Sequence, residues 1–275
     1  MKLTRMGWIA GLAMVSLLLG SVPLAAAPQQ LSFNQIYITD VRDVSFVVSW
    51  TTDTASDGGV EWGTTETPDG SWSTTWDVVG SSTTHYVMIT GLTAGETYYF
   101  QVHSGGETDN NGGAYYSVTT GPTLGLPGTD RSIRGYVYAP GSTTPVPNAV
   151  VYMQLQGSGG NSQWVSARAD DTYGFWTYVL DNVRVSSYDA YYTIQDGVDS
   201  LIMRTQGGEV GYVGNTFTVP AAGSYPAMFN TTLEDTPNAV TLSKLTSQNG
   251  AFTGAGVLIG LCAVMGLVVL SPRKK

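Results

Sequence analysis

The only two histidines of the chain, His85 and His103, lie in one β-forming stretch, HYVMITGLTAGETYYFQVHSG. Histidine is a common metal ligand and general base, so this pair is the first candidate for an active site. In alternating strands, His85 shares the inward face with Val87 and Ile89, whereas His103 points outward. Side chains on opposite faces of one sheet cannot share a metal, and zinc needs three or four converging ligands. We therefore interpret His85 as an edge-of-core residue and His103 as a solvated one.

Other catalytic signals are missing from the sequence. Cys262 is the only cysteine and lies in an apolar run near the C-terminus, so no thiolate is expected near the histidines. The segment GSGGNS (157–162) lacks the Gly-x-Ser-x-Gly spacing of a nucleophile elbow, and no histidine follows His103. The sequence therefore predicts no enzyme activity, no metal and no cofactor.

Two tryptophans stand four residues apart in DGSWSTTWD (69–77), surrounded by small polar residues. Exposed indoles offer flat surfaces that stack on sugar rings, so Trp72 and Trp76 are candidate ligand-binding residues. The alternative is that at least one of them caps an open end of a sandwich, because tryptophan is mostly buried in folded proteins.

A cluster of oxygen ligands lies in GGETDNNGG (105–113), where Glu107, Asp109 and Asn111 are candidate calcium ligands. The alternative is a solvated loop rich in turn-forming residues, since the spacing matches no dedicated calcium loop.

The elements that would position these residues are strands. Short runs rich in Val, Ile, Thr, Tyr and Trp alternate with Gly, Asp, Asn and Pro every 8 to 12 residues, and helical periodicity is nearly absent. This pattern predicts an all-β fold with two tandem, immunoglobulin-like β-sandwich domains.

The first domain, residues 30–122, resembles a fibronectin type III module. The likeness rests on DVSFVVSWTTD, HYVMITGLTAGETYYFQV and YYSVTTGP in that order. Trp50 matches the strand-B tryptophan, and Leu92 and Tyr98 match the tyrosine corner, which implies structural roles. The same stretch also looks like the module before the catalytic domain of purple acid phosphatases. Phosphatase activity would need metal-binding histidines downstream, and the chain has none there.

The second domain, residues 131–235, resembles a carboxypeptidase regulatory-like, transthyretin-like sandwich. The resemblance is clear over residues 131–182, with Asp170 as an alternative to Asp171. The matching positions are Gly135, Pro145, Ala149, Val151, Asp171, Gly174 and Phe175. Beyond residue 182 the sequence still alternates, and Asp196-Gly197 is a dipeptide typical of hairpin turns. A carboxypeptidase zinc site would need a His-x-x-Glu motif, which the chain lacks.

The two ends of the chain predict its location. Residues 1–26 read as a signal peptide, with a basic start, an apolar middle and small residues before the cleavage site. Residues 251–270 carry no charge and are long enough for a single transmembrane helix, and the basic tail 271–275 belongs in the cytoplasm. Residues 123–130 then form a linker and 236–250 a stalk, and the bulk of the chain lies outside the cell.

Charge narrows the range of partners. Residues 28–250 contain all 21 acidic residues of the chain but only seven basic ones, which argues against nucleic acid. The small-xxx-small pairs Gly250/Gly254 and Gly256/Gly260 allow a weak homodimer through the membrane helix, and a glycine-rich single span is the alternative. The predicted function is a non-enzymatic surface protein for adhesion, recognition or spacing with a protein or glycan ligand. The alternatives are a carbohydrate-binding accessory module and a subunit of a surface complex.

Lysine is absent between residues 28 and 243. A Lys–Asn or Lys–Asp amide, the internal cross-link of collagen-adhesin B-type repeats, therefore cannot form there, because arginine stays protonated. With no disulfide available either, packing and hydrogen bonds alone should stabilise both domains, and Trp50→Ala should unfold the first without disturbing the second.

Overall fold

The computed structural model describes residues 35–128 and 130–234. The predicted signal peptide, stalk, membrane helix and basic tail lie outside these residues. Residues 35–128 and 130–234 contain no helix with the length and hydrophobicity of a membrane span.

The described chain is all-β, with two separate hydrophobic cores. We call residues 35–122 module one and residues 131–234 module two. Each module has two sheets whose alternating apolar residues face each other, as in a β-sandwich.

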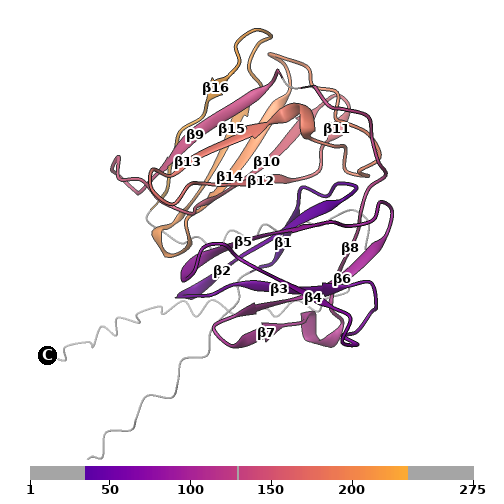
Figure 1. Cartoon of the computed structure of the whole chain (residues 1–275). Helices are drawn as coiled ribbons and strands as arrows, with labels where there is room; N and C mark the ends of the chain where they lie inside the picture. The colour runs from indigo at the N-terminus through magenta and orange to yellow at the C-terminus, as the bar shows by residue number, and fades with distance from the viewer. Residues whose placement is uncertain (1–34, 129, 235–275) are drawn as a thin grey trace, which may run out of the picture. The chain divides into compact units, whose positions relative to one another are not determined.

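Module one has a three-stranded sheet with the order β1-β2-β5, and a second sheet with the order β4-β3-β6-β7 in which β8 also pairs with β6 (Figure 1). The strands are β1 (Tyr37–Thr39), β2 (Ser45–Ser56), β3 (Gly59–Gly63), β4 (Ser73–Trp76), β5 (Ser82–Thr90), β6 (Thr97–Ser104), β7 (Glu107–Asp109) and β8 (Tyr116–Thr119).

The core of module one follows from the period of two in its strands. Phe46, Val48 and Trp50 of β2 face Phe100 and Val102 of β6, and all five side chains are buried. Fully burying side chains of this size contributes about 1.5–3 kcal/mol each.

Module two pairs a four-stranded sheet, built on β9 with β13, β16 and β17, with a five-stranded sheet built on β10 and β14. The strands are β9 (Ser132–Tyr138), β10 (Val150–Gly157), β11 (Gly160–Asn161), β12 (Val165–Arg168), β13 (Phe175–Val179), β14 (Ser200–Gln206), β15 (Tyr212–Thr218), β16 (Ala227–Met228) and β17 (Thr231–Thr232). The described residues also form three single-turn 3₁₀ helices: η1 (Asn111–Gly113) in module one, and η2 (Leu180–Asn182) and η3 (Gly208–Val210) in module two.

The structure shows which of two aspartates, Asp170 or Asp171, organises the turn before β13. Asp170 Oδ1 accepts hydrogen bonds from the amides of Thr172 and Tyr173, whereas Asp171 bonds only the Thr172 hydroxyl. Gly174 follows with a φ of 65°, a left-handed conformation that suits glycine. Asp170 therefore takes the role for which the sequence left two candidates.

One expectation for module two is wrong. Residues 186–199 form turns and one isolated bridge, Arg184 to Tyr191, rather than a further strand. Asp196-Gly197 does form a turn, but it does not join two paired strands. Arg131 holds this turn through two hydrogen bonds to Asp196, of 2.9 and 2.7 Å, so a partly buried ion pair replaces a strand partner.

Candidate functional site

His85 lies inside the core of module one. Its ring stacks on Trp50 with the centroids 4.9 Å apart, and Nε2 lies 3.2 Å from the Thr52 hydroxyl. Nδ1 is buried and has no hydrogen-bond partner among the described residues. Burial lowers the pKa of His85 to about 4, and the nearby Asp77 and Asp57 only partly oppose this shift. The imidazole is therefore neutral at physiological pH and is held as a packing residue.

His103 lies on the other face of the second sheet. Its Nε2 is 3.3 Å from Glu61 Oε2, and its Nδ1 is 2.9 Å from the Thr108 hydroxyl. The two histidines thus do not converge. Among the described residues, no group of three or more His, Cys, Asp or Glu side chains could hold a metal ion.

The candidate structural residues lie in the core of module one. The Trp50 side chain is fully buried and its Nε1 donates to the Ser104 hydroxyl at 3.0 Å. Leu92 is buried, and the hydroxyl oxygen of Tyr98 accepts a 2.9 Å hydrogen bond from the backbone N–H of Thr93.

The candidate calcium ligands are not brought together around a cavity. Asp109 uses Oδ1 to accept from the Asn111 amide at 2.9 Å and Oδ2 to accept from the Tyr116 hydroxyl at 2.9 Å. Glu107 is exposed, and the Asn111 side-chain amide donates to the Tyr115 carbonyl. These oxygen atoms close the turn between β7 and β8.

The candidate ligand-binding tryptophans lie on the outer face of the β4-β3-β6 sheet. Trp76 pairs with Gly59 in the β3–β4 register and is 55% exposed, whereas Trp72 is half-buried. Trp72 Nε1 donates to the Thr65 hydroxyl at 2.8 Å, and its ring meets Tyr115 edge-on at 5.4 Å.

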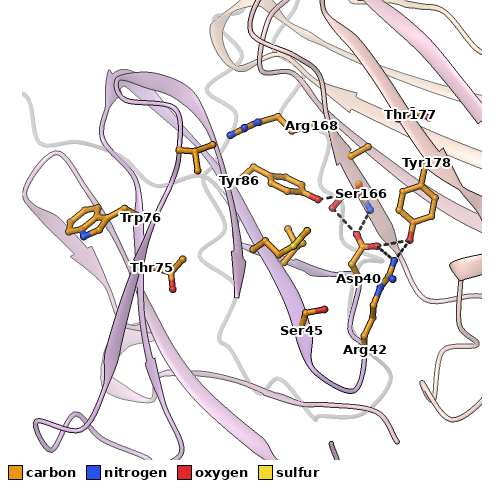
Figure 2. A pocket seen from close by; sticks show the side chains of 14 residues that line it. Asp40, Arg42, Ser45, Thr75, Trp76, Tyr86, Ser166, Arg168, Thr177 and Tyr178 are labelled. Carbon is orange, nitrogen blue, oxygen red and sulfur yellow. Dashed lines mark hydrogen bonds and ion pairs between the residues drawn. The ribbon is translucent and has the colours of Figure 1, made fainter. Parts of the chain in front are cut away.

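The most extensive polar arrangement joins the two modules, and the sequence did not predict it. Asp40 follows β1 in a left-handed conformation and is buried against module two. Its Oδ1 accepts from the Tyr178 hydroxyl at 2.6 Å, and its Oδ2 accepts from the Ser166 amide at 2.6 Å (Figure 2). Burial raises the pKa of Asp40, while the bonds from Tyr178 and Ser166 and the nearby Arg42 act in the opposite direction.

A second carboxylate of module one, Asp77, has a side chain with no exposed surface. Its Oδ2 accepts from the Tyr86 amide on the free edge of β5 at 2.8 Å. Its Oδ1 accepts from Arg168 of module two at 2.8 Å and from the Val79 amide at 3.0 Å. The carboxylate therefore covers a strand edge and forms an ion pair between modules at the same time.

A second ion pair between the modules involves Arg184 of module two, which is only 3% exposed. Its guanidinium lies 3.1 Å from Asp43 and donates to the carbonyl of Pro122 at 2.9 Å and of Tyr188 at 3.1 Å. One arginine thus joins two segments of module one, at Asp43 and at its last residue Pro122, to module two.

Neutral contacts extend this interface along β1 and β2. Ser49 and Tyr152 share a buried hydroxyl hydrogen bond of 2.9 Å, and the Val41 amide donates to the Gln163 side chain at 2.9 Å. Since buried polar groups are costly unless they are paired, these contacts favour one relative placement of the modules.

Beside this network lies a groove of about 570 Å³, lined by both modules. Its apolar lining includes Val47, Met88 and Ala167, and its charged groups are Asp40, Arg42 and Arg168. All three charged groups are engaged with one another, with Tyr178 or with Asp77. The charged groups of the lining are therefore part of the interface between the modules.

Comparisons with known proteins give likeness of fold only. No family model and no curated protein matches the chain. Among solved structures, PhoD matches with 14% identity and a TM-score of 0.28, over 42% of this chain and 25% of that chain. This chain thus spans a quarter of the PhoD structure.

Two further solved structures match at similarly low scores. A two-domain fibronectin type III segment of chicken tenascin has 11% identity and a TM-score of 0.24, over 68% of this chain and 99% of that segment. The pilus 2b backbone protein of group B streptococcus has 10% identity and a TM-score of 0.24, over 74% of this chain and 96% of that protein. Scores this low transfer no activity or partner to this chain.

Proposed function

We propose that this chain is a non-enzymatic, membrane-tethered surface protein whose two docked sandwiches act as a rigid unit for spacing and recognition. Module one is of the fibronectin type III kind, and module two is of the carboxypeptidase regulatory-like kind. The strand order of module one and the bond from Thr93 to the Tyr98 hydroxyl support the first assignment.

The single observation that carries the proposal is the charge arrangement between the modules. Module one supplies Asp43 and Asp77, and module two supplies Arg184 and Arg168 as their partners. The two charge pairs hold specific groups of the two modules at 2.8 and 3.1 Å, and this geometry favours one relative placement of the modules. A flexible tether would not need two such pairs.

The surface location rests on the sequence of the two ends. A signal peptide over residues 1–26 and a membrane helix over residues 251–270 would place both sandwiches outside the cell. Protease added to intact cells should remove residues 28–250 and leave a small membrane-bound fragment. Full-length protein that survives until the cells are lysed would contradict this orientation.

A carbohydrate-binding role is the second candidate, because the half-exposed indole of Trp76 is unusual for a residue that normally packs in a core. A role as a subunit of a surface complex would appear as a stable partner that co-purifies with the full chain.

A further inference from the structure

The outer face of the β4-β3-β6 sheet has two glycines where side chains would normally stand. Gly59 and Gly63 of β3 flank Glu61 on this face, while Val60 between them is buried in the core. Gly59 pairs with Trp76 on β4 and with His103 on β6.

Each glycine is covered by the flat face of an indole. A methyl group added at Gly59 would lie 2.6, 2.8 and 3.2 Å from three bonded ring carbons of Trp76. At Gly63 it would lie 2.1, 2.5 and 2.8 Å from three bonded ring atoms of Trp72. Similar distances to three bonded atoms place the face of the ring, rather than its edge, against the glycine. The opposite face of each indole therefore points away from the sheet.

Polar groups fill the space between the two rings. Glu61 Oε2 accepts a 2.6 Å hydrogen bond from the Gln101 amide and lies 3.3 Å from His103 Nε2. The side chains of Glu61 and His103 are 28% and 26% exposed. In the part of the chain that the structure describes, Glu61 Oε1 and the Gln101 carbonyl oxygen accept no further hydrogen bond. They are open to hydroxyl donors from a ligand.

The spacing and the charge define the ligand. The tryptophans are four positions apart in extended chain, which places their backbones about 13 Å apart, longer than one sugar ring. The strands β3, β4, β6, β7 and β8 carry Glu61, Glu107 and Asp109 but neither arginine nor lysine. Acidic polysaccharides, nucleic acid and anionic membranes would be repelled by such a face.

We propose that this indole face, defined by Trp72, Trp76, Glu61, Gln101 and His103, binds a neutral oligosaccharide. The two indoles stack on sugar rings, and the carboxylate and amide between them accept hydrogen bonds from sugar hydroxyls. Trp76 also lines the groove between the modules, at its far side from Asp40 and Tyr178 (Figure 2), whereas Trp72, Glu61, Gln101 and His103 are not among the lining residues. The inference specifies the recognition part of the proposed function.

The test is a binding titration of the purified full chain in detergent with cellohexaose, xylohexaose, mannohexaose and chitohexaose. Hexagalacturonate serves as the acidic probe. We expect at least one neutral hexasaccharide to bind, and hexagalacturonate not to bind. Trp72→Ala and Trp76→Ala should each weaken that binding by about tenfold or more. Tyr173→Ala, which removes a 65% exposed aromatic ring of module two, should leave it unchanged.

A second variant covers the case in which an alanine variant fails to fold. Thr74 is exposed on β4 and pairs with Glu61, so Thr74→Arg would place a long side chain between the indoles without uncovering a glycine. It should abolish binding while the thermal midpoint of the protein stays the same. Lack of binding by every neutral probe, or binding that survives Thr74→Arg or the loss of both indoles, would overturn the proposal. Such a result would leave the spacing function standing, since that function does not depend on this face.

Discussion

A buried neutral histidine makes the stability of module one dependent on pH. The pKa of His85 falls to about 4 in the folded protein, against an ordinary value of about 6.5. Protons therefore bind more tightly to the unfolded chain. The stabilising contribution is complete above pH about 6.5 and is lost as the pH falls towards 4, by roughly 3 kcal/mol in total.

Urea unfolding of the wild type and of His85→Gln between pH 8 and 4 measures this contribution. We expect the wild type to lose more stability than His85→Gln over that range. Equal losses in both proteins would mean that His85 does not titrate in the folded core.

At the residue scale, Arg168 should stabilise the interface through its ion pair with Asp77, in addition to the packing of its side chain. Arg168→Met leaves the Asp77 carboxylate buried without its cation. We expect this to lower the free energy of unfolding by about 1–3 kcal/mol. Arg134→Met, at an exposed arginine of β9, is the matched control and should change stability by less than about 0.5 kcal/mol. A change at position 168 no larger than the control would show that the ion pair contributes nothing.

At the scale of the elements, alternation predicted much of the fold and little of the interface. Residues Phe46, Val48 and Trp50 could be placed inward because one face of each strand must be buried. The same pattern failed at residues 186–199, because there Arg131 and Asp196 replace strand pairing, and a pairwise contact between distant residues leaves no periodic signal.

Some residues of the candidate sites could be predicted from the sequence and others could not. Trp72, Trp76 and the outward His103 could be found from residue type and alternation, and the structure adds Glu61 and Gln101 between them. Asp40 and Asp77 could not be assigned, since their partners Ser166 and Arg168 lie about ninety or more residues away. The only sequence signal for these contacts was compositional: the acidic chain contains few arginines.

The interface changes what is expected of Trp50→Ala. Removing a buried tryptophan costs about 3–5 kcal/mol, a large share of the stability of one domain. Tyr152 and Arg184 of module two are both buried and both bond to module one, so unfolding module one would leave them without these partners. Module two should therefore lose stability as well, in contrast to the independence that the sequence suggested.

Amide hydrogen exchange of the full chain measures the protection of each module separately. In Trp50→Ala, we expect faster exchange in β10 and β12 as well as in β2. Unchanged protection throughout module two would show that the modules fold independently.

At the scale of the whole molecule, the absence of lysine predicts reversible unfolding. The segment 28–243 contains neither lysine nor cysteine, so it can form no internal amide or disulfide. Intact-mass measurement of this segment after complete unfolding should give the mass of the plain sequence, apart from any glycan. A mass lower by one ammonia or one water would reveal a cross-link that this chemistry does not allow.

The central claim is that the interface, rather than the linker, fixes the two sandwiches relative to each other. Spin labels at Glu107→Cys and Ala222→Cys, both exposed, would report the distance between the modules in full-length protein carrying Cys262→Ser. Pulsed electron paramagnetic resonance should give one narrow distribution of distances between the two labels. Six glycine and serine residues inserted in linker 123–130 should leave it unchanged, whereas Asp43→Ala with Asp77→Ala should broaden it. A broad distribution in the protein with the native linker and interface would contradict the claim.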